Sequence, residues 1–166
     1  MKLSFVRLLL LGSLISLTSP AISASAPPTS PEAKSIEALV AKAAGEIEKK
    51  GKATFPEFRK KGSEWLYGDT YIFVYTLDGT VILNAAFPNA EGGNPATSPA
   101  PTDRGPINPQ AYSKEFIETV KTKGSGWVGY MYTRPGSTEP TQKWSFVKKV
   151  TIDGTQGLVG AGFYPK

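Results

Sequence analysis

Two tight turns constrain the fold of this chain more than any other feature of its sequence. Asp78-Gly79 and Asp153-Gly154 each separate two runs of β-forming residues, which is typical of β-hairpins. A hairpin joins neighbouring antiparallel strands, whereas a parallel pair needs a much longer crossover. The strands of this chain are therefore expected to form an antiparallel sheet.

Two longer helices accompany the strands. Ser30 is a favourable N-cap and Gly51 a stop signal, so a helix of about twenty residues is expected between them. A second helix is expected from Asn108 to Gly124, between the second and third strands, and a short one over 55–61. The expected strands are 71–75, 81–83, 127–133, 142–150 and 157–164. Hairpin-linked strands with segregated helices indicate an α+β fold with one five-stranded sheet.

The N-terminus has the three-part layout of a secretory signal peptide. Lys2 and Arg7 precede an apolar run over 8–17, and small residues gather from 19 to 26. The apolar run is short for a membrane span, although an uncleaved anchor is the alternative. We expect a cleaved signal peptide over 1–26 and a periplasmic or secreted protein.

The rest of the chain is expected to form one domain. Residues 27–32 are a proline-containing leader, and residues 33–165 are the domain itself. The proline-rich stretch 86–108 is long for a connection inside a compact domain, so it is either functional, for example a lid, or mobile.

The chain has no cysteine and no histidine. This excludes disulfides, thiolate nucleophiles, histidine triads and metal sites built on these residues. We therefore expect no cofactor and no metal. General acid–base catalysis most often uses histidine, so an exported enzyme is the least favoured interpretation.

The formal net charge is +5, and Lys2 and Arg7 contribute two of these charges. Further bases gather over residues 49–61. A nucleic-acid interface would combine such bases with exposed aromatic residues on one face. A solvated helix end explains them more simply, and no nucleic-acid partner is expected.

Five segments, in order, resemble the single Cache family of extracellular, PAS-like sensor domains. They are Glu48 to Lys52 with Phe55 and Phe58, Gly68 to Tyr75 with the turn Asp78-Gly79, Gly124 to Val128 with Tyr130, Pro140 to Lys148, and Val159 to Tyr164. The resemblance covers about residues 33–165. It implies a long N-terminal helix on one face of a five-stranded antiparallel sheet and a small-ligand pocket on the other. Such domains usually lie between membrane helices of chemoreceptors, so this chain resembles a free-standing exported form.

Lys143 is the first candidate for ligand binding. It matches the lysine that the family carries just before its aromatic-rich strand. An ammonium among aromatic walls attracts a carboxylate more strongly than it would in water. The alternative is a lysine at a strand edge that faces solvent.

Aromatic residues on two strands form the second candidate group. By period-two alternation, Tyr71 and Phe73 share one face of their strand, and Tyr130 and Tyr132 share one face of theirs. Phenol hydroxyls on apolar walls suit a small polar ligand. The alternative is that these are core aromatics, and alternation alone does not say which face meets the helix.

Three further positions follow from the resemblance. Asp103 matches an aspartate that precedes the family's second helix, where it would accept from a ligand amine or cap a turn. Met131 stands where related sequences often carry an arginine that could clamp a carboxylate. Arg134 could replace that arginine only if the strand end curls inward.

These observations support two functions. The first is a periplasmic domain that binds or senses a small metabolite, such as a carboxylate, without catalysis. The second is a structural or interaction module of the envelope that keeps the Cache-like fold without its ligand. Expected partners are a small molecule and a membrane receptor or envelope protein, and the resemblance adds a homodimer through the N-terminal helix.

Overall fold

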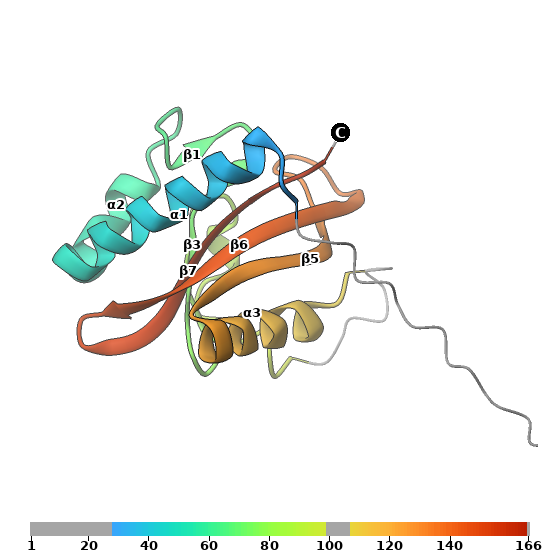
Figure 1. Ribbon diagram of the computed structural model, residues 1–166. Helices are drawn as coiled ribbons and strands as arrows, with labels where there is room; N and C mark the ends of the chain where they lie inside the picture. The colour runs from blue at the N-terminus through green and yellow to red at the C-terminus, as the bar shows by residue number, and fades with distance from the viewer. Residues whose placement is uncertain (1–27, 99–106, 166) are drawn as a thin grey trace, which may run out of the picture.

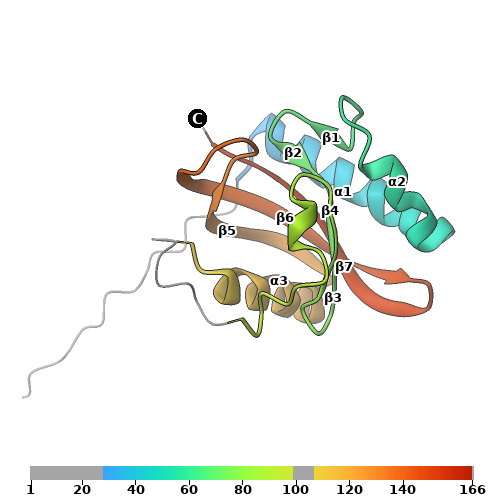
Figure 2. The same ribbon diagram turned by 180° about the vertical axis from the view of Figure 1, so that it is seen from behind.

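A computed structural model describes residues 28–98 and 107–165. A five-stranded antiparallel sheet lies between a long helix on one face and a shorter helix on the other (Figure 1; Figure 2 shows the reverse side). The expected α+β architecture is confirmed. The expected signal peptide and Asp103 lie outside the described residues.

Helix α1 (Pro31–Lys50) begins and ends where its sequence signals predict. The Ser30 hydroxyl accepts a hydrogen bond from the Ala33 amide at 3.2 Å, and Gly51 ends the helix with a positive φ of 57°. Its buried face includes Ile36, Val40 and Ile47, which pack on β6 and β7. This apolar stripe at helical spacing fixes α1 against the sheet.

The central sheet has the strand order β4-β3-β7-β6-β5, and every neighbouring pair is antiparallel. Its strands are β3 (Phe73–Thr76), β4 (Val81–Asn84), β5 (Ser125–Thr133), β6 (Pro140–Ile152) and β7 (Thr155–Phe163). The last three form two long hairpins, and β3 joins them by pairing with β7. Strands β3 and β7, which are far apart in the sequence, therefore lie side by side in the sheet.

The strand expected over 71–75 is divided. Thr70–Tyr71 (β2) pairs with Leu66–Tyr67 (β1) in a separate two-stranded sheet, and β3 begins only at Phe73. Ile72 lies at the crossing point, where its amide donates to the Trp65 carbonyl at 3.2 Å and its own carbonyl accepts from the Ala85 amide at 3.0 Å. The chain thus changes sheets without leaving a buried backbone group unpaired.

Helix α3 (Pro109–Lys123) covers the second face of the sheet. The Asn108 side chain caps it by accepting from the Ala111 amide at 3.0 Å. Phe116 and Val120 on α3 pack with aromatic residues from β3 and β5. The smaller helices are η1 (Gly51–Thr54), α2 (Phe55–Phe58) and η2 (Pro88–Ala90), so the helix expected over 55–61 is shorter than predicted.

An ion pair holds the first part of the segment after β4. Arg59, just beyond α2, donates to both carboxylate oxygens of Glu91 at 2.7 and 2.8 Å. One of these oxygens also accepts from the Asn84 amide at 2.8 Å, and the Arg59 guanidinium lowers the pKa of Glu91. The described part of the expected loop 86–108 is therefore tied to the edge of the sheet (Figure 2).

Glycines in β7 make room for the side chains on the α3 face. A Cβ atom at Gly160 would overlap the ring of Phe73, and one at Gly162 would overlap the Trp144 carbonyl oxygen. The latter would also lie 3.0 Å from Lys143 Cε. The absence of side chains at these two positions allows bulky neighbours to lie flat on the strand.

We expect Gly160→Ala to destabilise the fold by about 1–3 kcal/mol, because the added methyl group forces the Phe73 ring to move in a packed core. Urea unfolding monitored by circular dichroism measures the change. Gly45→Ala is the control: no atom lies within 4 Å of its added Cβ, and alanine favours the helix, so stability is kept or raised by up to about 1 kcal/mol. Equal stability of the two variants would contradict the tight contact at Gly160.

Candidate functional site

Lys143 on β6 is the centre of the candidate site. Its side chain is 1% exposed, and no other charged side chain in the described ranges is buried. The register places it opposite Tyr130 on β5. The alternative of a solvent-facing lysine at a strand edge is wrong, because the side chain enters the layer between the sheet and α3.

Four aromatic rings surround the Lys143 ammonium. The distances from Nζ to the ring centroids are 4.0 Å for Tyr71, 5.3 Å for Tyr132, 5.3 Å for Tyr164 and 5.8 Å for Phe73. All lie within the range in which a cation is attracted to the face of a ring. This aromatic cage, defined by these four rings, compensates part of the cost of removing the ammonium from water.

A hydrogen-bonded chain leads from the amine to the backbone. Lys143 Nζ donates to the Tyr71 hydroxyl at 2.7 Å, and the Tyr71 and Tyr164 hydroxyls are hydrogen-bonded to each other. Tyr164 donates its own proton to the Thr133 carbonyl at 2.5 Å, so Tyr71 is the donor to Tyr164. Burial raises the pKa of both phenols, which keeps them protonated.

Burial changes the acidity of Lys143 itself. Desolvation lowers the pKa of its ammonium to about 7, and the negative charge of Asp69 partly opposes this change. Both protonation states are thus populated near neutral pH. The protonated state is a buried cation, and the neutral state is a buried amine with a free electron pair.

Asp69 and Arg134 form an ion pair beside the cage. Arg134 Nη1 lies 2.5 Å from Asp69 Oδ2, and the guanidinium lies 4.7 Å from the centroid of the Tyr164 ring. Arg134 and Lys143 therefore both lie within cation–π distance of the Tyr164 ring. Arg134 does not contact the lysine, but it holds the carboxylate that acts on the pKa of Lys143.

The other predicted aromatics lie on the same face. Tyr130 shares a hydrogen bond of 3.0 Å with the Ser145 hydroxyl, and Tyr132 packs edge-on against Phe87 at 5.6 Å. Phe87 also contacts Tyr71 at 5.6 Å. Phe87 and Tyr132 are only half-buried and thus form the outer wall of the cage. The two predicted aromatic pairs do share one face, and it is the face opposite α1.

The remaining predicted residues have different positions. Trp127 lies on the α1 face, where it packs against the core and its indole donates to Glu37 Oε1 at 2.7 Å. Met131 is half-buried against the aromatic cluster and supplies no charge. Asp103 cannot be placed, because it lies outside the described residues.

Sequence reasoning missed three contributors to this site. Tyr164 stands in the sequence only as the end of a segment that resembles the family, and the sequence assigns no ligand-binding role to Asp69 or to the glycines of β7. The signal for Gly162 was its place at a paired position in a strand, where a glycine often marks the close approach of another group. The pairing of Asp69 with Arg134 joins residues far apart in the sequence and had no local signal.

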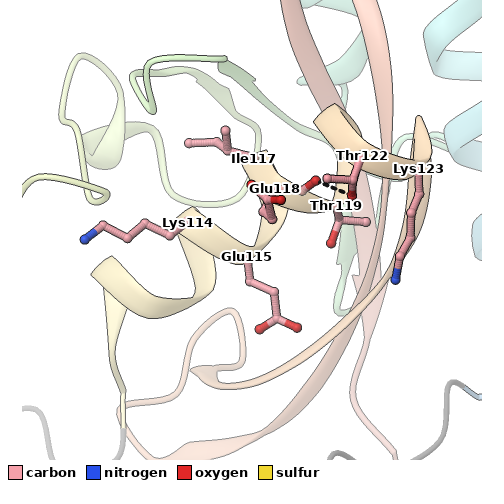
Figure 3. Close-up of a pocket in the computed structure, with 7 residues that line it drawn as sticks. All are labelled: Lys114, Glu115, Ile117, Glu118, Thr119, Thr122 and Lys123. Carbon is pink, nitrogen blue, oxygen red and sulfur yellow. Dashed lines mark hydrogen bonds between the residues drawn. The ribbon is translucent and has the colours of Figure 1, made fainter.

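Two surface pockets among the described residues lie away from Lys143. One is a hollow of about 680 Å³ on the outer side of α3, and Figure 3 shows that all seven of its side chains come from that helix. It carries both charges, with Lys114 and Lys123 beside Glu115 and Glu118. The other, of about 420 Å³, lies between the start of α1 and the β1–β2 hairpin. Neither contains a predicted site residue.

The described ranges, 28–98 and 107–165, contain neither a membrane-spanning helix nor a cluster of metal-ligating side chains. No helix there is both long enough and apolar enough to span a membrane. No three aspartate, glutamate, histidine or cysteine side chains there lie close enough together to hold a metal ion.

The fold corresponds to a known class of domain. A family model described as Cache domain matches residues 38–165. This chain belongs to the Cache domain family.

Solved structures with this fold include several chemotaxis sensors. A periplasmic sensor domain of a chemotaxis protein is 28% identical, with a TM-score of 0.65 over 81% of this chain and 95% of that domain. A Cache chemosensory domain described for carboxylic acid recognition is 22% identical, with a TM-score of 0.62 over 80% and 92%. A methyl-accepting chemotaxis protein from Vibrio parahaemolyticus RIMD 2210633 is 17% identical, with a TM-score of 0.58 over 79% and 86%. No match was found among curated proteins.

We expect the buried amine to make stability depend on pH. The folded state releases the Lys143 proton near pH 7, whereas an unfolded lysine keeps it to about pH 10.4. The unfolded state binds more protons between these values, so the contribution of Lys143 to the free energy of unfolding rises with pH across this window. Below pH 7, the full cost of the buried charge remains.

Lys143→Met removes this dependence. At pH 6 the variant should be more stable than the natural protein by about 3–5 kcal/mol, and the difference should shrink towards pH 10. Urea titrations from pH 6 to 9.5 measure it. Lys114→Met removes an exposed lysine and should keep the pH profile of the natural protein. A pH-independent difference between Lys143→Met and the natural protein would contradict a lowered pKa.

Proposed function

We propose that this chain is an exported sensor domain that binds a small carboxylate at the α3 face of the sheet, with Lys143 as the anchor. The observation that carries the proposal is a buried ammonium with one hydrogen bond to a described group. An ammonium has three N–H donors, and Lys143 uses one of them on Tyr71. A carboxylate supplies both the missing acceptors and the missing negative charge.

The aromatic surroundings suit a small ligand of this kind. Apolar walls from Phe73 and Tyr132 would bury the carbon skeleton, and the hydroxyls of Tyr71 and Tyr130 would offer further hydrogen bonds. At 22% identity, the likeness to the carboxylic-acid-recognising domain concerns the fold alone. The ligand class is therefore argued from Lys143.

The proposed place of action is outside the cytoplasm. The signal-peptide pattern at the N-terminus supports export to the periplasm or secretion, and the relative that is 28% identical is a periplasmic sensor domain. In this role the domain binds its ligand without turnover. It passes the signal to a membrane receptor or envelope protein, and α1 is the candidate surface for a homodimer.

A structural or interaction module without a ligand is the second candidate. Met131 favours it, because this uncharged side chain occupies the position at which related sequences often carry a carboxylate-clamping arginine. Cooperative folding combined with no response to any small acid would support this function instead.

We expect acetate to raise the thermal unfolding midpoint, whereas acetamide, which has the same shape without the charge, should not. A ligand at a hundred times its dissociation constant adds about 2.7 kcal/mol, which corresponds to several degrees. Affinity should fall roughly tenfold from pH 6 to pH 8, because the binding form of Lys143 is lost above its pKa of about 7. Titration calorimetry at the two pH values measures this. An equal response to acetamide, or an undiminished response in Lys143→Met, would reject Lys143 as the anchor.

Asp69→Asn should shift the same pH dependence. Removing the negative charge that supports the Lys143 ammonium lowers its pKa further, so the loss of acetate affinity should begin at a lower pH. Binding at pH 7 should weaken several-fold and recover at pH 5.5. Asp78→Asn is the matched control, because Asp78 is exposed in the β3–β4 turn, where it contacts Thr76 and Thr80. An identical shift in both variants would show that Asp69 has no specific effect.

A further inference from the structure

The neutral form of Lys143 is suited to a second kind of chemistry. Its ammonium loses its proton about three pH units earlier than an ordinary lysine, and no carboxylate among residues 28–98 and 107–165 lies within ion-pair distance of it. A desolvated lysine amine is a nucleophile towards carbonyl groups. The adjacent Tyr71 hydroxyl, 2.7 Å from Nζ, supplies the proton donor that such a reaction needs.

We propose that Lys143 captures a small carbonyl compound, an aldehyde or a 2-oxo acid, as a reversible imine. The proposal rests on the proposed function for the access of small ligands to this face. The two proposals use different protonation states of Lys143. The ammonium binds a carboxylate, whereas the neutral amine attacks a carbonyl carbon.

The reaction is balanced by the groups present. The Nζ electron pair forms a bond to the carbonyl carbon, and the oxygen takes up a proton, which gives a carbinolamine. The carbon–oxygen bond then breaks, nitrogen and carbon form a double bond, and the oxygen leaves as water with both protons that the amine has lost. Tyr71 relays these protons from nitrogen to oxygen, and its raised pKa keeps the phenol protonated between transfers.

The aromatic cage favours this product over an anionic one. The imine nitrogen then takes up a proton from water, and the resulting iminium ion restores a positive charge at the place of the ammonium, whose Nζ lies 4.0 to 5.8 Å from the four ring centroids. A carbamate formed from carbon dioxide would place a negative charge against the same ring faces, which repel it. The rings of Phe87 and Tyr132, whose centroids are 5.6 Å apart, are only half-buried, and we expect a small molecule to reach the amine from the side that they cover.

Reductive trapping tests the proposal. The purified protein is incubated at pH 7.5 with glyoxylate and cyanoborohydride, and peptide mass spectrometry locates the carboxymethyl group left on lysine. We expect Lys143 to be labelled more than about tenfold faster than exposed lysines, because a much larger fraction of it is neutral. The labelling rate should rise between pH 6 and pH 8, whereas carboxylate affinity falls over the same range.

Variants separate capture from simple binding. Tyr71→Phe should slow labelling of Lys143 at least about tenfold, because the proton relay is lost, and Lys114→Met should leave it unchanged. Labelling confined to exposed lysines, or labelling of Lys143 at their rate, would overturn the proposal. Glycolate, which lacks the carbonyl, is the binding control. A thermal shift with glycolate but no capture of glyoxylate rejects the imine and keeps the carboxylate sensor, whereas no response to either compound rejects both.

Discussion

One buried amine, that of Lys143, organises the face of the sheet that α3 covers. Moving an ammonium out of water costs several kcal/mol unless other groups compensate for it. Here the compensation comes from ring faces and one phenol rather than from an ion pair with a carboxylate, because Asp69 acts on Lys143 only from a distance. The result is an incompletely compensated charge, which is costly for a stable core and, in the proposed function, attracts a carboxylate ligand.

The rest of the α3 face can be understood from the need to accommodate the buried Lys143 side chain. Lys143 can lie flat over β7 because Gly162 has no side chain, and Phe73 can do so because Gly160 has none. The β5–β6 register then sets Tyr130 beside the lysine, and β2 brings Tyr71 to it from another sheet. The four rings of the cage thus come from three separate parts of the chain: Tyr71 and Phe73 from one segment, Tyr132 from β5 and Tyr164 from just beyond the end of β7. The opposite face, under α1, is an ordinary apolar core and fixes the sheet on which the cage is built.

The sequence predicted the elements well and the site in part. Helix caps at Ser30 and Asn108, the two hairpin turns and strand alternation are local signals, so the elements and the face shared by Tyr71 and Phe73 could be read directly. Alternation could not tell which face meets α1, because both faces of the sheet are buried. The contacts of Asp69 with Arg134 and of Tyr164 with Tyr71 depend on strand order, which a single sequence does not reveal.

The Arg59–Glu91 ion pair makes one part of the structure sensitive to salt concentration. It ties the segment that carries Phe87, the outer wall of the cage, to the end of α2, and both its side chains are partly open to solvent. Dissolved ions screen such a pair, with a Debye length of about 10 Å at 0.1 M salt and about 3 Å at 1 M. Salt concentration therefore acts on the ion pair that positions the segment carrying Phe87, at the outer wall of the cage.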